Sequence, residues 1–503
     1  MRTEGQGFQL VVKGTSYSLL SLIAVRALTV ISSIAVARML GKTNLGMLAI
    51  INNITGLAVL FATLGVPTAL TKYVAQYAAQ DRTKLGPVVG TSLVALLVPV
   101  ILLSAGLFLA AGPIARGIYH EPALTLLIRI AAAILLANSL GTFGFGQALL
   151  QGLKEVKRIS IINIVASAIG LPVVIGLTAA FHLTGTATAQ LILAALGAIL
   201  LARGIRQVGF RFGTLKFDRA FLSRLLNLAF PAFFSGLVMT PALWITTTRL
   251  SVAKGFSEVG LFNICFGLFQ MILFLPMAVG MPLIPMIAES YRTDSERLKR
   301  LIRPSLEIVA FVTLLLSAAI GIFARPVIFL LYGPGYLEAA RPMTLMAGAV
   351  FFSSLGYVVG HYFSGTGKMW TGMGFNLLWF GVLIGLALWL ITGLGVLGLA
   401  AAFWISYLLM AIGILIYART VISIPIGYLA LLSVLSLGVT FLSQSFLLRL
   451  HGLASVGSGL ALLAVVAGLD YWLLPAKAEL RSSLALVVNR LRGRGPLPGG
   501  NSR

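Results

Sequence analysis

Residues 14–37, GTSYSLLSLIAVRALTVISSIAVA, decide the fold class, because this apolar run is long enough to cross a bilayer as a helix. Arg26 lies at the middle of the run. At about 1.5 Å of rise per residue, its guanidinium is roughly 18 Å along the helix from Gly14, too deep to reach the lipid headgroups easily. Arg26 therefore needs a water-filled cavity or a partner.

The composition extends this reading to the whole chain. The 503 residues are 59% hydrophobic and 10% charged, with a mean hydropathy of +1.01, which excludes an ordinary soluble globular protein. A net charge of +24 would suggest a nucleic-acid partner in a soluble chain. Here the lysines and arginines lie mostly in short connections between apolar runs, so we expect no nucleic-acid partner.

Apolar runs of about 20 residues predict an all-α polytopic membrane protein with about fourteen transmembrane helices. The predicted spans are 14–37, 45–70, 86–112, 124–149, 159–182, 184–205, 226–249, 259–288, 304–325, 342–364, 371–392, 396–417, 426–448 and 453–475.

An internal repeat relates the two halves of the chain. Equivalent helices run in the same direction, so the repeat predicts two pseudo-symmetric six-helix lobes related by an axis along the membrane normal, with two extra C-terminal helices. The matched positions, first half with second, are Arg38 with Arg249, Gly46 with Gly260, Gly65 with Gly280, Tyr77 with Tyr291, Tyr119 with Tyr332, and Gly152-Leu153-Lys154 with Gly365-Thr366-Gly367-Lys368.

The repeat and the charge runs together predict the domain organisation. The expected parts are an N-lobe at 1–205, a cytoplasmic amphipathic linker at 206–225, a C-lobe at 226–417, spans 13 and 14 at 418–475, and a basic cytoplasmic tail at 476–503. In the linker, Phe217, Phe221 and Leu225 would share one helical face, as in helices that lie on membrane surfaces. A solvated basic loop is the alternative.

The distribution of basic residues predicts the orientation. Lys and Arg number 27 on the face that holds both termini and 9 on the opposite face. By the positive-inside rule, both termini are expected in the cytoplasm of a multi-pass protein in the cytoplasmic membrane. The basic linker and tail make anionic membrane lipids expected partners.

Thr29 and Ser33 share a helical stripe with Arg26, so one face of the first span is polar and is expected to line a cavity. A buried positive charge favours an anionic ligand, and the planar fork of arginine suits phosphate oxygens. The alternative is a structural anchor, with Arg26 donating to carbonyl groups of a neighbouring helix.

Further candidates for substrate binding lie on other spans. Arg38 and Arg249, at the predicted outer ends of spans 1 and 7, would extend a basic path from Arg26, or would reach the outer headgroups instead. The amides of Asn52, Asn138 and Asn263 would contact a ligand or bond neighbouring helices.

Several residue classes are missing from the predicted spans. No acid lies at mid-membrane in either predicted lobe, which disfavours a multidrug antiporter for cations. The sequence shows no catalytic triad, no paired carboxylates and no cluster of metal ligands, so we expect no catalytic residue, no metal and no cofactor. A membrane glycosyltransferase or polymerase is therefore the weaker alternative, and coupling to an H⁺ or Na⁺ gradient stays open.

These features resemble the oligosaccharide (O-antigen type) flippases of the multidrug, oligosaccharidyl-lipid and polysaccharide (MOP) exporter superfamily. The resemblance implies translocation of a polyprenyl-diphosphate-linked oligosaccharide by alternating access, with polysaccharide-assembly enzymes as candidate partners. In the related lipid II flippases a first-span arginine engages the diphosphate, and Arg26 is similar by position. The residues that carry the resemblance are Arg26, Ala37-Arg38-Met39-Leu40-Gly41, Gly46, Leu64-Gly65-Val66-Pro67 and Gly280-Met281-Pro282.

Overall fold

The computed structural model describes the backbone of residues 2–142, 144–210, 215–291, 295–421, 426–445 and 453–474. Within these ranges, side chains are described outside residues 2–21, 235–236, 275, 278–282, 285, 295–297, 299–300, 420–421, 426 and 453–456. The predicted basic tail at 476–503 lies outside the described residues. The described chain is helical, without strands, which confirms the predicted all-α class.

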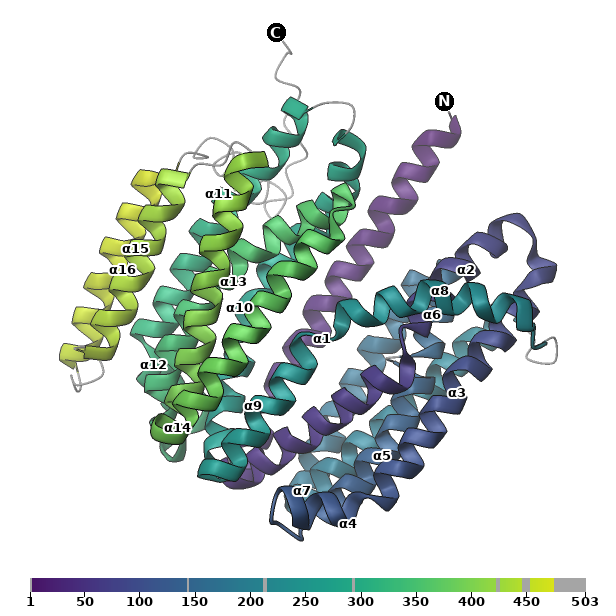
Figure 1. Ribbon diagram of the computed structural model, residues 1–503, viewed down its shortest axis with the longest axis horizontal. Coiled ribbons are helices and arrows are strands. Elements are labelled where there is room, and N and C mark those ends of the chain that lie inside the picture. The colour runs from purple at the N-terminus through teal and green to yellow at the C-terminus, as the bar shows by residue number, and fades with distance from the viewer. Residues whose placement is uncertain are drawn as a thin grey trace. The chain divides into compact units, whose positions relative to one another are not determined.

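The main helices follow the predicted spans in order (Figure 1). They are α1 (Arg2–Thr63), α2 (Val66–Gln80), α3 (Leu85–Leu109), α4 (Ala111–Pro113), α5 (Leu124–Leu140), α6 (Phe145–Gly152), α7 (Val156–Gln207), α8 (Arg219–Gly236), α9 (Met239–Lys254), α10 (Phe256–Ser290), α11 (Ser295–Ile322), α12 (Ala324–Tyr332), α13 (Ala340–Thr366), α14 (Met369–Val421), α15 (Ile426–Ser445) and α16 (Leu453–Leu473).

Three long helices are each broken near the middle. The breaks lie at Gly41 in α1 (φ 71°), His182 in α7 (φ 50°) and Gly395 in α14 (φ 58°). A positive φ cannot continue a right-handed helix, and glycine adopts it at the lowest cost. Each arm of a broken helix corresponds to one predicted span. The breaks at Gly41 and Gly395 fall in predicted connections, and His182 is the last residue of the predicted span 159–182.

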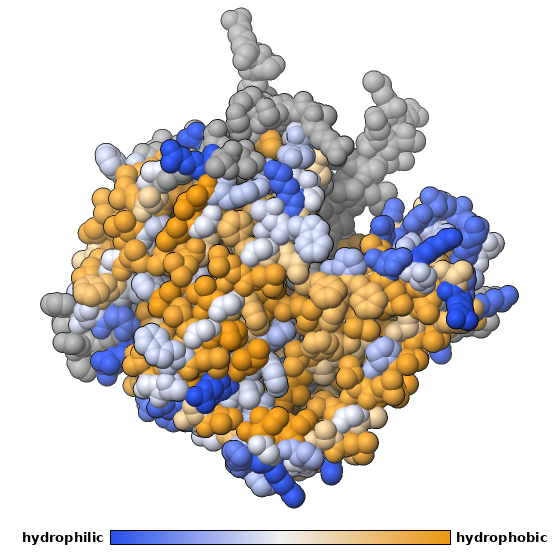
Figure 2. Space-filling view, in the orientation of Figure 1, coloured by the Kyte–Doolittle hydropathy of each residue, from blue (hydrophilic) through white to orange (hydrophobic). Residues whose placement is uncertain are grey.

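Long apolar helices account for most of the described chain. Nine are long and apolar enough to cross a membrane by length and composition, or ten if the bent pair α8–α9 forms one span. In Figure 2, apolar side chains cover most of the visible helix faces, and strongly hydrophilic residues gather near the helix ends. Large apolar side chains such as Leu109, Trp389 and Phe441 are more than two-thirds exposed, as expected for residues that face lipid.

The chain divides into two compact units. Unit 1 comprises residues 1–263 and 331–335, and unit 2 comprises residues 264–330 and 336–503. In unit 1, α8 packs against α2 and α3, and α9 packs against α1. The first compact unit therefore includes the seventh span, whereas the lobe boundaries predicted from the repeat remain a prediction.

The start of α8 follows directly from its sequence. Asp218 caps the helix by accepting hydrogen bonds from the backbone N–H groups of Ala220 (2.9 Å) and Phe221 (3.1 Å). Phe221 and Leu225 are buried in the core of unit 1, as their shared face predicts, but Phe217 precedes the helix and is 54% exposed. The Tyr73 ring meets the Phe221 ring at 5.0 Å, so this segment packs on protein within unit 1.

Two repeat-related glycines meet inside unit 1. A β-carbon added to Gly46 of α1 would lie 1.8 Å from the Phe256 carbonyl oxygen, and one added to Gly260 of α10 would lie 1.9 Å from the Lys42 carbonyl oxygen. Each contacted carbonyl belongs to the residue four positions before the partner glycine. The contact is therefore reciprocal, as expected where equivalent helices of a repeat cross near their symmetry axis.

A second pair of equivalent glycines has the same role within each unit separately. In unit 1, a β-carbon on Gly152 would lie 2.7 Å from the β-carbon of Val74. In unit 2, a β-carbon on Gly365 would lie 2.6 Å from a side-chain methyl of Ile287. Because Val74 and Ile287 are separated by the same 213 positions as the two glycines, the structure reproduces the predicted repeat at this contact.

We predict that Gly46→Ala destabilises the protein by about 1–3 kcal/mol, because the added methyl group must displace a backbone carbonyl. The measurement is thermal unfolding of the purified protein in detergent. Gly106→Ala in α3 is the matched control, since nothing lies within 4 Å of its added carbon and alanine favours a helix. Equal melting temperatures for the two variants would show that the crossing does not constrain the fold.

Candidate functional site

Arg26, on the first arm of α1, is the cation that lies at the middle of the first predicted span. Its side chain is partly buried. Its Nε atom is buried and has no hydrogen-bond partner among the described residues. An unsatisfied donor on a cation is costly in a low-dielectric environment, so the geometry leaves a donor available for an anionic ligand.

Thr29 and Ser33 follow Arg26 along the same helix and are both exposed. The Thr29 hydroxyl donates to the Val25 carbonyl (2.8 Å), and the Ser33 hydroxyl donates to the Val30 carbonyl (2.9 Å). Each hydroxyl therefore satisfies its donor within its own helix and keeps oxygen lone pairs as acceptors. The stripe remains polar without requiring a protein partner from another helix.

Arg38 lies three residues before the break at Gly41 and is exposed. Its Nε donates to the carbonyl oxygen of Leu331, which belongs to the same compact unit, at 2.7 Å. Arg38 therefore binds backbone through at least one donor, as the structural alternative for an arginine at a helix end allows. Arg249, its repeat equivalent on α9, is partly buried.

Polar side chains connect α9 to two other segments of unit 1. Asn53 of α1 donates to the Thr247 hydroxyl at 2.9 Å. The next residue, Thr248, shares a hydrogen bond of 2.9 Å with the hydroxyl of Tyr119, whose ring lies 6.4 Å from that of Phe256. These bonds join the two residues directly before Arg249 to the first half of the chain.

The three predicted amides have different environments from Asn53. Asn52 is exposed on α1, whereas Asn138 on α5 and Asn263 on α10 are partly buried. The described part of the chain contains no hydrogen bond for these three side chains, in contrast to Asn53. Their predicted ligand contacts therefore remain predictions, and the structure does not place them in one shared site.

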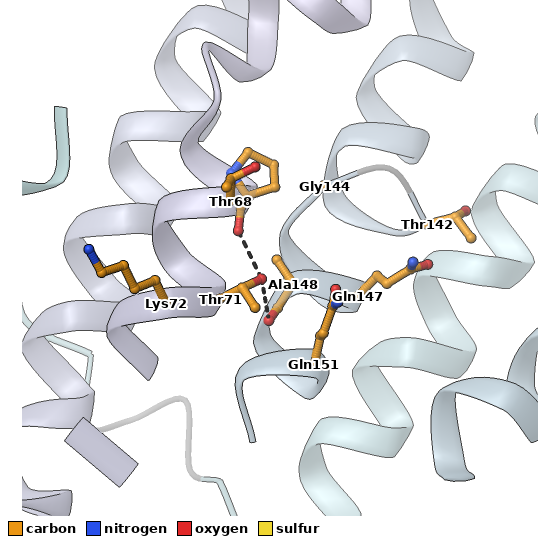
Figure 3. A pocket seen from close by; sticks show the side chains of 9 residues that line it. Thr68, Thr71, Lys72, Thr142, Gly144, Gln147, Ala148 and Gln151 are labelled. Atoms are coloured by element: carbon orange, nitrogen blue, oxygen red, sulfur yellow. Dashed lines mark hydrogen bonds between the residues drawn. The ribbon is translucent and has the colours of Figure 1, made fainter. Parts of the chain in front are cut away.

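A polar cavity of about 450 Å³ opens between α2 and α6 in unit 1 (Figure 3). Its size is within the range of small-molecule sites. The Thr71 hydroxyl lies within hydrogen-bond distance of the Pro67 (3.0 Å) and Ala148 (3.2 Å) carbonyls, which ties the two helices together. The lining residues are Pro67, Thr68, Thr71, Lys72, Thr142, Gly144, Gln147, Ala148 and Gln151.

The side chains of the cavity supply both hydrogen-bond donors and acceptors. In Figure 3 the amide end of Gln147 extends toward Thr142, while the Lys72 ammonium extends away from them. Hydroxyl and amide groups bind the hydroxyls of a sugar, and an ammonium group binds an anion. The arrangement can therefore hold a polar, neutral or anionic group.

The polar lining is specific to the first half of the repeat. By the matched pairs Gly65 with Gly280 and Tyr77 with Tyr291, Thr68 corresponds to Leu283 and Lys72 to Met286 or Ile287. By the matched pair Tyr119 with Tyr332, Thr142 corresponds to Leu355 and Gln147 to Gly360. A purely structural polar cluster would serve both halves equally, so this asymmetry favours a functional role. None of the polar residues that line the cavity was predicted from the sequence to bind substrate, although Thr68, Thr71 and Lys72 form a helical stripe that could have identified the cavity.

Comparisons with known proteins agree on one class of membrane protein. A protein-family model described as "Polysaccharide biosynthesis protein" matches residues 11–291. A search of curated proteins gave no match.

Solved structures of the MOP superfamily share the fold. The lipid II flippase MurJ in an inward closed conformation is similar with a TM-score of 0.72 and 14% identity, covering 90% of this chain and 98% of that chain. A multidrug resistance MATE family transporter in an inward-facing conformation is similar with a TM-score of 0.68 and 17% identity, and the match covers 81% of this chain and 98% of that chain. A MOP superfamily transporter from Pyrococcus furiosus is similar with a TM-score of 0.58 and 17% identity, and the match covers 82% of this chain and 95% of that chain. At these identities the similarity establishes the fold alone.

We predict that the cavity between α2 and α6 is filled with water. Gln147→Cys should then react with a charged, water-soluble maleimide, and Leu149→Cys, at a fully buried position on the same helix, should not. The wild-type background should be low, because the single native cysteine, Cys265, is buried. Mass spectrometry of the labelled protein gives the readout, and equal labelling at both positions would contradict a defined cavity.

Proposed function

Because the chain belongs to the polysaccharide biosynthesis protein family, we propose that it is a flippase that moves a polyprenyl-diphosphate-linked oligosaccharide across the cytoplasmic membrane by alternating access. The observation that carries this proposal is Arg26, a cation within an apolar span whose buried Nε has no partner among the described residues. Intramembrane charges are expensive and are retained mainly for function.

Arg26 is proposed to hold the diphosphate. A guanidinium presents several N–H donors in a planar fork that matches phosphate oxygens, and charge-assisted hydrogen bonds are stronger in a low-dielectric site. The hydroxyl oxygens of Thr29 and Ser33 lie on the same helix and can accept from the first sugar. Arg38 and Arg249 are proposed as secondary basic contacts, and Asn52, Asn138 and Asn263 as polar contacts.

The cavity between α2 and α6 is proposed to take part of the glycan. It offers hydroxyl and amide groups that can bind sugar hydroxyls, and Lys72 at its edge suits an acidic sugar or a phosphate. The prenyl tail would remain in lipid, since the described helices present large apolar side chains on their outer faces. No chemical bond changes in this cycle, so the proposed activity is transport and not catalysis.

A multidrug antiporter is the second candidate function, because MATE transporters share the fold. Such a protein would need an acid to pair a cationic drug inside its substrate site. Among the described residues, the buried acids are Glu307 and Asp470, and both lie in unit 2, away from Arg26 in the chain. The basic character of unit 1 favours an anionic substrate.

The predicted orientation forms part of the proposal. With both termini in the cytoplasm, the basic tail and linker would face anionic lipids, and polysaccharide-assembly enzymes on the same side would deliver the substrate.

We predict that Arg26→Ala and Arg26→Lys each lower flipping by about tenfold or more, because even lysine loses the bidentate contacts to the diphosphate. The assay follows a fluorescent polyprenyl-diphosphate sugar across proteoliposome membranes. Arg116→Ala, at an exposed arginine outside the proposed site, is the control and should transport at the wild-type rate. Wild-type rates in both Arg26 variants would refute the assignment.

We predict that Asp81→Cys reacts with a membrane-impermeant maleimide only from the cytoplasm, and Glu121→Cys only from outside, because these exposed turns follow the second and third predicted spans. Labelling of intact cells and of inverted membrane vesicles separates the two sides. The reverse pattern would overturn the proposed orientation.

A further inference from the structure

Three helices of unit 2 pack together around one buried acid. α11 contacts both α15 and α16, and α15 and α16 contact each other. Near one end of α16, the α-carbon of Gly459 approaches Ile322 and Phe323, and a β-carbon there would lie 2.9–3.1 Å from their side chains. Near the other end, Asp470 meets Tyr428 at the start of α15. The two extra helices are thus joined to each other through a polar contact, and α16 packs on the end of α11 through apolar side chains.

Asp470 points into the protein although its neighbours along α16 point outward. The side chains of Leu469, Tyr471 and Trp472 are 41%, 38% and 72% exposed, whereas Asp470 is 0% exposed. A surface acid with no role would have been free to face water beyond the helix end. The inward direction means that the fold accepts the cost of burying a carboxyl group here.

The two carboxyl oxygens of Asp470 differ in their hydrogen bonding. Oδ1 accepts a hydrogen bond of 3.2 Å from the Tyr428 hydroxyl. Oδ2 is buried and has no partner among the described residues. A carboxylate with full negative charge would therefore be stabilised in this site by a single neutral donor.

The other buried acid among the described residues of unit 2 provides the comparison. Glu307 on α11 is 2% exposed, and its Oε1 lies 2.9 Å from the Nε of Arg303, so an arginine compensates its charge. Among the described residues, Tyr428 on α15 bonds Asp470 and interacts electrostatically with Glu307, which pairs with Arg303 on α11, and Tyr471 is adjacent to Asp470 on α16. Arg303 is engaged by Glu307, and among the described residues no lysine or arginine forms an ion pair with Asp470.

We propose that Asp470 is a proton-binding site in the extra helices and that it couples the transport cycle to protons. A proton from water binds Oδ2 and converts the carboxylate to a neutral carboxylic acid, and release of the same proton restores the charge. The neutral form suits the buried position and the charged form does not, so the occupancy of the site alters how α16 packs against α11 and α15. Tyr428 is a positioning residue that holds Oδ1.

The site gives the two extra helices a role that the six-helix repeat does not require of them. Coupling to protons deepens the proposed flippase function and rests on it. Proton binding by Asp470 does not depend on the flippase function, and it can be measured on purified protein without any transport substrate. The two parts therefore have separate experiments.

The first experiment is infrared difference spectroscopy of the purified full-length protein, recorded across a pH titration. We expect a carboxylic-acid C=O band that shifts in D₂O, is lost in Asp470→Asn and changes frequency in Tyr428→Phe, because the phenol bonds Oδ1. A purely structural acid would give no such titrating band. Absence of the band in the wild type, or its persistence in Asp470→Asn, would overturn the proposal, whether or not the protein flips lipids.

The second experiment measures flipping of the fluorescent polyprenyl-diphosphate sugar in proteoliposomes with and without an imposed pH gradient. We expect the gradient to change the wild-type rate and Asp470→Asn to lose that dependence. Asp81→Asn, at an exposed acid that caps a short turn, should keep it, since asparagine caps equally well. A wild-type response to the gradient in Asp470→Asn, or no response in the wild type, would overturn the coupling.

Discussion

Close backbone contact at four glycines sets how the helices of this protein pack. In lipid, apolar side chains gain little from being buried against one another, so helices associate where small residues let their backbones approach. Gly46 and Gly260 meet each other's carbonyls, and Gly152 and Gly365 receive Val74 and Ile287. Each contact leaves no room for a β-carbon, so the path of the helices around these four positions is fixed.

These contacts also explain how one chain can have two related halves with different chemistry. The glycine contacts are common to both halves, because they set the geometry of the helices. The side chains between them are free to differ, and Thr68 and Lys72 in the first half correspond to apolar residues in the second, Leu283 and either Met286 or Ile287. Selection on function could therefore act on one half without disturbing the shared packing.

Buried charge is the second physical theme of the molecule. Glu307 is compensated by Arg303 at 2.9 Å, which is the ordinary solution for an acid removed from water. Arg26 and Asp470 each keep a buried polar atom without a partner in the described residues, one a donor and the other an acceptor. The two groups lie in different compact units, and their opposite charges suit different ligands, a phosphate for the cation and a proton for the acid.

The all-α membrane class, the helix breaks at Gly41 and Gly395, the family and the repeat could be predicted from the amino-acid sequence, because apolar length, glycine and spacing are local properties of the chain. The packing of the helices was needed to show that Gly46 meets Gly260, that Asn53 rather than Asn52 bonds Thr247, and that an open pocket lies between α2 and α6. It also decided that Asp470, which the sequence places near a helix end, turns inward to Tyr428. Such contacts depend on which face of each helix meets its neighbour, and one residue of rotation along a helix separates an exposed side chain from a buried one.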